Sequence, residues 1–164
     1  MKKRRWLLFV LLLLLLAGCG AEKTAGETVV HEPLELTVLY GETRTQALWG
    51  TTTWTDETGL HQEGDAFHLL LWEELRTPVV LPPEGSLTAR LEWDVMPDRI
   101  AVECWPEDCW GRTEVPGESV TVDQDGTLTL KDGGHIYCVT AEWDYLPRNW
   151  GGKVYYGFCI TAAK

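Results

Sequence analysis

Serine is scarce in this chain, which contains only Ser86 and Ser119 against eighteen threonines. Neither serine lies in a Gly-x-Ser-x-Gly or Ser-x-x-Lys pattern, so the nucleophile of the serine hydrolases and penicillin-binding enzymes has no recognisable setting. Threonine instead accompanies valine, tryptophan and tyrosine, residue types that favour a pleated, half-buried surface. The composition therefore indicates β-structure and gives no support to serine-based catalysis.

Basic residues are also few, with 14 Lys and Arg against 25 Asp and Glu. Four of the basic residues occupy positions 2–5, so residues 19–164 hold 10 basic and 25 acidic residues, a net charge of −15. Nucleic-acid binding needs a basic stripe, and adhesion to an anionic bilayer needs a polybasic segment. Residues 19–164 contain neither, and their acidity is typical of a solvated exterior.

The longest apolar run is short and follows the basic residues, at positions 6–16. Spanning a hydrocarbon core takes about 20 residues, so the run indicates a secretory signal peptide. It closes on Leu16-Ala17-Gly18-Cys19, which resembles the lipobox of lipoprotein signal peptides. The resemblance implies cleavage after residue 18 and a diacylglyceryl group on the Cys19 sulfur, which would anchor the chain to the extracytoplasmic face of a cell membrane. The alternatives are an ordinary secretory signal, with Cys19 incidental, and an uncleaved helix.

The remaining chain divides into a tether and one domain. Residues 19–33 are small, polar and charged, without periodicity, and indicate a flexible tether. Residues 34–164 contain short alternating segments between turn signals such as Pro97-Asp98 and Asp125-Gly126, each interpreted as a hairpin turn. This pattern predicts an all-β fold, an antiparallel immunoglobulin-like β-sandwich. Residues 66–77 are the exception and could form a short helix or a strand.

The last predicted hairpin carries a recognisable motif. Its strands read Tyr-x-Val-x-Ala-x-Trp from Tyr137 and Tyr-x-Phe-x-Ile from Tyr156, each with its large apolar residues on one face. The motif resembles the closing hairpin of small bacterial membrane-anchored lipoproteins of uncharacterised function. Those proteins are also similar in the Gly-Thr-x-x-Trp segment at Gly50 and the strand–Pro-Asp–strand unit at residues 91–102. The resemblance implies a sandwich and no particular activity.

Four cysteines follow Cys19, and an even number in an exported domain favours disulfides. If Asp144 and Lys153 close the last hairpin, Cys138 lies directly opposite Cys159, and Cys104 and Cys109 bracket a turn-forming loop. We therefore predict the pairs Cys104–Cys109 and Cys138–Cys159. The rival is a zinc site made by all four cysteines, or by three of them with His135, although Cys-x-x-Cys knuckles are lacking.

Tryptophan is the one excess with a possible functional meaning. Trp105, Trp110 and Trp150 fall in predicted turns, where exposed rings could form a stacking platform for a sugar or a protein partner. The alternative, which we favour, is that they fold back as caps over the ends of the sandwich. The histidines are scattered, and the partial calcium-loop pattern at Asp123 to Gly126 is better explained by a turn.

The sequence therefore predicts a lipid-anchored, non-enzymatic binding or interaction module without a metal or other cofactor. Its partners would be the membrane, through Cys19, and an envelope protein or glycan. A carbohydrate-binding module that uses the loop tryptophans is the first alternative. A glycan-processing enzyme built on dispersed carboxylates, such as Glu73-Glu74 or Glu107-Asp108, is the second.

Overall fold

A computed structural model describes residues 32–64, 68–76, 79–81 and 87–162. The predicted signal peptide, Cys19 and nearly all of the tether lie outside these residues. Within them no helix is long and apolar enough to cross a membrane.

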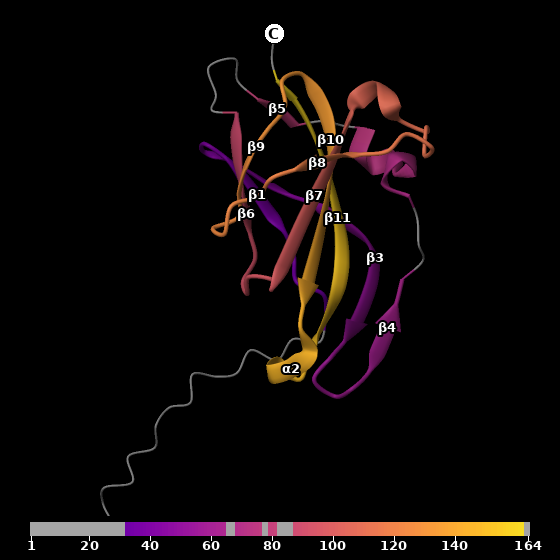
Figure 1. Cartoon of the computed structure of the whole chain (residues 1–164), viewed down its shortest axis with the longest axis vertical. Helices are drawn as coiled ribbons and strands as arrows, with labels where there is room; N and C mark the ends of the chain where they lie inside the picture. The colour runs from indigo at the N-terminus through magenta and orange to yellow at the C-terminus, as the bar shows by residue number, and fades with distance from the viewer. Residues whose placement is uncertain (1–31, 65–67, 77–78, 82–86, 163–164) are drawn as a thin grey trace, which may run out of the picture.

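Two mostly antiparallel β-sheets face each other, which confirms the predicted all-β sandwich (Figure 1). The smaller sheet is antiparallel and has the order β2-β1-β6-β9: β2 (Thr43–Gln46), β1 (Thr37–Tyr40), β6 (Thr88–Glu92) and β9 (Thr127–Thr129). The larger sheet has the order β4-β3-β11-β10-β7-β8: β4 (His61–Glu63), β3 (Leu48–Thr55), β11 (Gly151–Ala162), β10 (Gly134–Trp143), β7 (Arg99–Pro106) and β8 (Glu118–Val120). Its seventh strand, β5 (Val79–Leu81), pairs with β11 in parallel.

The main core fills the space between the sheets, and its large side chains alternate along the strands as predicted. Tyr137, Trp143, Tyr156 and Phe158, all from the closing hairpin, are buried there. Trp54 meets Trp143 with ring centroids 5.6 Å apart at an interplanar angle of 75°, an edge-to-face geometry favoured by aromatic quadrupoles. Trp93, directly after β6 of the smaller sheet, also meets Trp143 of the larger sheet, with ring centroids 6.2 Å apart at 82°, so aromatic rings join the two inner faces.

The register of the closing hairpin differs from the prediction by two residues. Glu142, rather than Asp144, lies opposite Lys153, and the last pair is Trp143 with Gly152. The connection contains a short helical turn, α2 (Tyr145–Arg148), followed by Asn149 in the left-handed conformation at φ 61°. Both lie within the predicted loop, but Asp144, which the prediction placed in the ladder, is the N-cap of this turn, and Gly152, which it placed in the loop, pairs with Trp143.

Two predicted hairpins are connections between the sheets. Pro97-Asp98 lies between β6 of the smaller sheet and β7 of the larger one, so these strands do not pair with each other. Asp125-Gly126 does form a tight turn, in which the Gly126 N–H donates to the Asp123 carbonyl at 2.9 Å. However, β8 and β9 on either side of it belong to different sheets, and only Val122 and Leu128 form a bridge across it.

Residues 66–77 were predicted as a helix or a strand, and their described part, residues 68–76, contains two 3₁₀ turns: η1 (Leu69–Leu71) and η2 (Glu73–Arg76). Together with η3 (Glu107–Cys109) they lie against the outer face of the larger sheet. They cover a second hydrophobic cluster, the outer cluster, made of Leu69, Leu70, Leu75, Trp105, Cys109, Ile136, Cys138 and Cys159.

Candidate functional site: an aromatic pocket on the outer face

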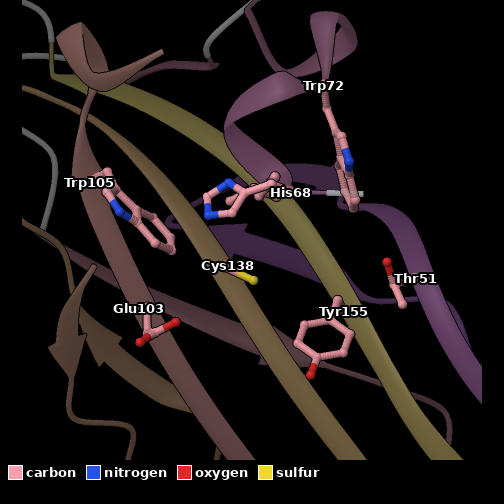
Figure 2. A pocket seen from close by; sticks show the side chains of 8 residues that line it. Thr51, His68, Trp72, Glu103, Trp105, Cys138 and Tyr155 are labelled. Atoms are coloured by element: carbon pink, nitrogen blue, oxygen red, sulfur yellow. The ribbon is translucent and has the colours of Figure 1, made fainter. Parts of the chain in front are cut away.

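A pocket of about 370 Å³ opens beside η1, on the outer face of the larger sheet. Figure 2 shows His68 between Trp105 and Trp72, with Cys138, Glu103 and Tyr155 on the neighbouring strands. Its described lining has four ring side chains, one carboxylate, one thiol, one hydroxyl and one aliphatic side chain: Thr51, His68, Leu69, Trp72, Glu103, Trp105, Cys138 and Tyr155. A mostly apolar lining with a few polar groups is the usual composition of a small-molecule site.

Trp72 reaches the sheet because two glycines leave room for its indole. A Cβ on Gly50 of β3 would lie 1.9 Å from Trp72 Cζ2, and a Cβ on Gly157 of β11 would lie 3.1 Å from Trp72 Cζ3. Gly157 also makes room for Leu69 and Leu75, whose Cδ1 atoms would be 2.4 and 2.5 Å from the added carbon. The segment that carries Trp72 therefore packs onto the sheet at two positions that have no side chain, Gly50 and Gly157.

His68 is oriented by the helical turn that it begins. Its Nδ1 accepts a hydrogen bond from the Leu70 N–H at 3.3 Å, as an N-cap side chain does. An Nδ1 that accepts has no proton, so the neutral ring carries its proton on Nε2. The ring meets Trp105 nearly edge-on, with centroids 6.1 Å apart at 70°. The pocket wall thus includes one imidazole N–H donor in a defined tautomer.

The Trp105 ring is held by the segment that precedes β8. Its Nε1–H donates to the Val115 carbonyl at 2.9 Å, and a Cβ on Gly117 would come within 2.6 Å of its Cζ2. Trp105 is only 5% exposed, although the sequence analysis predicted that it lies in a turn. Trp105 therefore forms a rigid wall of the pocket and lies on strand β7.

Cys138 and Glu103 lie directly opposite each other on β10 and β7. Burial, and to a lesser extent the nearby Glu103 carboxylate, raises the pKa of the Cys138 thiol to about 12. The thiol is therefore protonated at neutral pH, a state that is a poor nucleophile. Glu103 lines the same pocket, so its negative charge lies within electrostatic reach of a ligand there.

The four downstream cysteines are free thiols in this structure, and their positions do not match the predicted pairs. Cys138 lies opposite Gly157, while Cys159 lies opposite Ile136, because of the two-residue difference in register. Cys104 packs between the sheets, whereas Cys109 belongs to the outer cluster. The geometric argument for both pairs, Cys104–Cys109 and Cys138–Cys159, is therefore wrong.

The three singled-out tryptophans are not brought together. Trp105 belongs to the outer cluster and Trp110 packs against it, but Trp150 is in the main core. Trp150 lies against Trp54 with ring centroids 5.6 Å apart, and Arg148 covers it at 5.6 Å. Trp150 thus caps an end of the sandwich, and no platform of all three rings forms.

The sequence prediction missed six of the described lining residues: Thr51, His68, Leu69, Trp72, Glu103 and Tyr155. One signal was available: Tyr155 has the opposite parity to Tyr156 and Phe158, which places an aromatic ring on the outer face. No comparable signal placed Trp72 beside it. In the described part of the chain no group of three or more His, Cys, Asp or Glu side chains could hold a metal ion.

Comparison of the chain with protein-family models, with curated proteins and with solved structures finds no match in any of the three. A functional assignment therefore rests on the pocket and on the sequence motifs.

Proposed function

We propose that this chain is a lipid-anchored extracytoplasmic lipoprotein whose β-sandwich binds a small ligand without transforming it. The observation that carries the binding role is the aromatic pocket, where rings from three separate segments converge on a few polar groups. The anchor rests on the lipobox resemblance at Leu16 to Cys19. Both parts have their own test.

The position of the pocket supports this arrangement. The predicted tether leads into β1 of the smaller sheet, while the pocket lies on the outer face of the larger sheet. The ligand face and the anchored strand are therefore on different layers of the sandwich. Such a domain can be held at a membrane without covering its own binding site.

The chemistry of the lining favours binding over catalysis. Cys138, the one thiol in the described lining, is kept protonated by its burial. Glu103 is the one carboxylate there, whereas glycoside hydrolysis by the common mechanisms uses a pair about 5–9 Å apart. These features support a non-enzymatic role over the glycan-processing alternative.

A saccharide-binding module is the alternative proposal. The platform of Trp105, Trp110 and Trp150 does not support it, but the rings of Trp72, Trp105 and Tyr155 could stack on a sugar in the pocket. A protein or glycan of the cell envelope stays a proposed partner on this basis.

The binding role can be tested with a thermal-shift panel of small organic cations, neutral saccharides and amino acids. We expect at least one class to raise the Tm of the wild-type protein. The shift should be lost in Tyr155→Leu and kept in Tyr145→Leu, a change at an exposed tyrosine outside this pocket. If no class raises the Tm, or if Tyr155→Leu keeps the whole shift, the pocket is not the ligand site.

The anchor can be tested by metabolic labelling with palmitate. We expect the wild-type chain to incorporate label and Cys19→Ala to incorporate none. Equal labelling of the two chains, or no labelling of either, would overturn the lipoprotein assignment.

A further inference from the structure

The charges that line the pocket are all of one sign. Glu103 is its one carboxylate, and no lysine or arginine belongs to the described lining. Within the described residues Glu103 forms no ion pair. Glu103 therefore contributes a negative charge without a described ion-pair partner to the pocket, beside the ionisable ring of His68, in a chain that has a net charge of −15 from residue 19 onward.

The rings add a second attraction for positive charge. The faces of tryptophan and tyrosine rings carry negative electrostatic potential and attract ammonium groups within about 6 Å. Tyr155 already makes such a contact, because Lys153 Nζ lies 5.2 Å from its ring centroid. Glu142 holds that same ammonium at 3.2 Å, and Lys153 does not line the pocket. Trp72 and Trp105 supply further aromatic surface in the lining.

Two of the rings that line the pocket are also fixed in place before a small ligand enters. Trp105 is fixed by its hydrogen bond to Val115, and Trp72 is seated on Gly50 and Gly157. Rings held in this way lose little conformational freedom when a ligand enters. A volume of about 370 Å³ leaves space for a small organic molecule.

We infer that the pocket binds a small organic cation, with a primary or methylated ammonium group among Trp72, Trp105 and Tyr155 and its charge opposite Glu103. The inference rests on the proposed function, because it names the ligand class of that same site. It predicts that charge, and not shape alone, decides affinity.

The test compares choline with 3,3-dimethylbutan-1-ol, which has the same shape without the charge. Each is titrated calorimetrically into the full mature chain in a polyoxyethylene detergent, and N-acetylglucosamine serves as the neutral saccharide. We expect saturable choline binding, with the neutral alcohol at least about tenfold weaker.

Glu103→Gln should weaken choline binding at least about tenfold, because it removes the charge and keeps the shape. Glu42→Gln is the matched control: it removes one exposed negative charge in the turn between β1 and β2, on the smaller sheet. Both side chains are exposed, and equal thermal stability of the two variants verifies that folding is intact. Equal loss of binding in both variants would show a general charge effect and overturn the site.

The remaining outcomes separate the two proposals. Binding of the neutral alcohol as tight as that of choline, or of N-acetylglucosamine alone, overturns the cationic class and leaves the pocket as a binding site. Absence of a ligand for the pocket across the whole thermal-shift panel overturns the proposed function itself.

Discussion

The indole of Trp72 occupies the space that a side chain at Gly50 would need, since a Cβ there would lie 1.9 Å from Trp72 Cζ2. Gly50 is also where β3 departs from regular pairing: Thr52 pairs with Val154 and Trp49 with Tyr156, so β3 has one extra residue over this interval. The irregularity and the missing side chain together bring Trp72 down onto the sheet.

Gly50→Ala should therefore destabilise the fold by about 1–3 kcal/mol, the usual cost of overpacking a filled space. Urea unfolding followed by circular dichroism measures this cost. The control is the same substitution in a Trp72→Ala background, where no indole remains to be displaced. There the added methyl should be nearly neutral; an equal cost in both backgrounds would show that the strand, and not Trp72, requires glycine.

Tyr156→Phe should lower the free energy of unfolding by about 1 kcal/mol. The Tyr156 hydroxyl donates to the Leu34 carbonyl, 122 positions earlier in the chain, and so ties β11 to the segment before β1. The variant leaves that carbonyl without its donor. Tyr145→Phe removes a hydroxyl from an exposed ring and should change stability by much less. Equal effects of the two changes would refute a role for the bond.

Asp98→Asn should make stability less dependent on acid pH. Arg148 binds Asp98 with both terminal nitrogens, at 2.7 and 3.0 Å, and the Asp144 N–H also donates to it. The Arg148 hydrogen bonds lower the pKa of Asp98 below its usual 3.8. A lowered carboxyl pKa stabilises the fold above about pH 4, and that contribution is lost as the pH falls through the lowered value.

We therefore expect Asp98→Asn to cost about 0.5–1 kcal/mol at pH 7, the range of a surface ion pair, and less at pH 2–3. Urea unfolding at both pH values measures the difference. Asp132→Asn is the comparison, because Asp132 is exposed and has no ion pair with another described residue. A cost for Asp98→Asn that does not change with pH would contradict the linkage.

The four cysteines after Cys19 should not form the two predicted disulfides, and the buried thiols of Cys138 and Cys159 should be protected from alkylation. Burial raises the pKa of both Cys138 and Cys159 to about 12, so both stay protonated at pH 8 and should react with iodoacetamide far more slowly in the native protein than in the unfolded one. A peptide map of the unreduced protein should contain neither a 104–109 nor a 138–159 bridge. Finding either bridge would contradict the faces and the register described above.

The alternation of side chains predicted the sandwich and the inner face of the closing hairpin, but not its register. A shift of two residues keeps every side chain on its own face, because the period of a strand is two. Tyr137 and Phe158 were therefore placed correctly in the core, while Cys138 was given the wrong partner. The register depended on α2 and on Asn149, which no local pattern indicated.

The candidate site was less accessible from the sequence because it joins segments far apart in the chain. Trp72 reaches Gly50 and Gly157 only once η1 and η2 fold over the sheet. The prediction of a hairpin at Pro97-Asp98 was wrong for a related reason, since a local turn signal does not distinguish a hairpin from a connection between two sheets. Local patterns gave the strands, and long-range packing gave the pocket.

The segment that contains η1 and η2 and covers the pocket is flanked on both sides by strands of the larger sheet. The chain enters η1 from β4, which pairs with β3, and leaves η2 into β5, which pairs with β11 beyond the end of β3. Because both flanking strands are hydrogen-bonded into the sheet, we expect this segment not to move as a lid about a single hinge. The rate at which a ligand leaves would then report its contacts in the pocket rather than the motion of a lid.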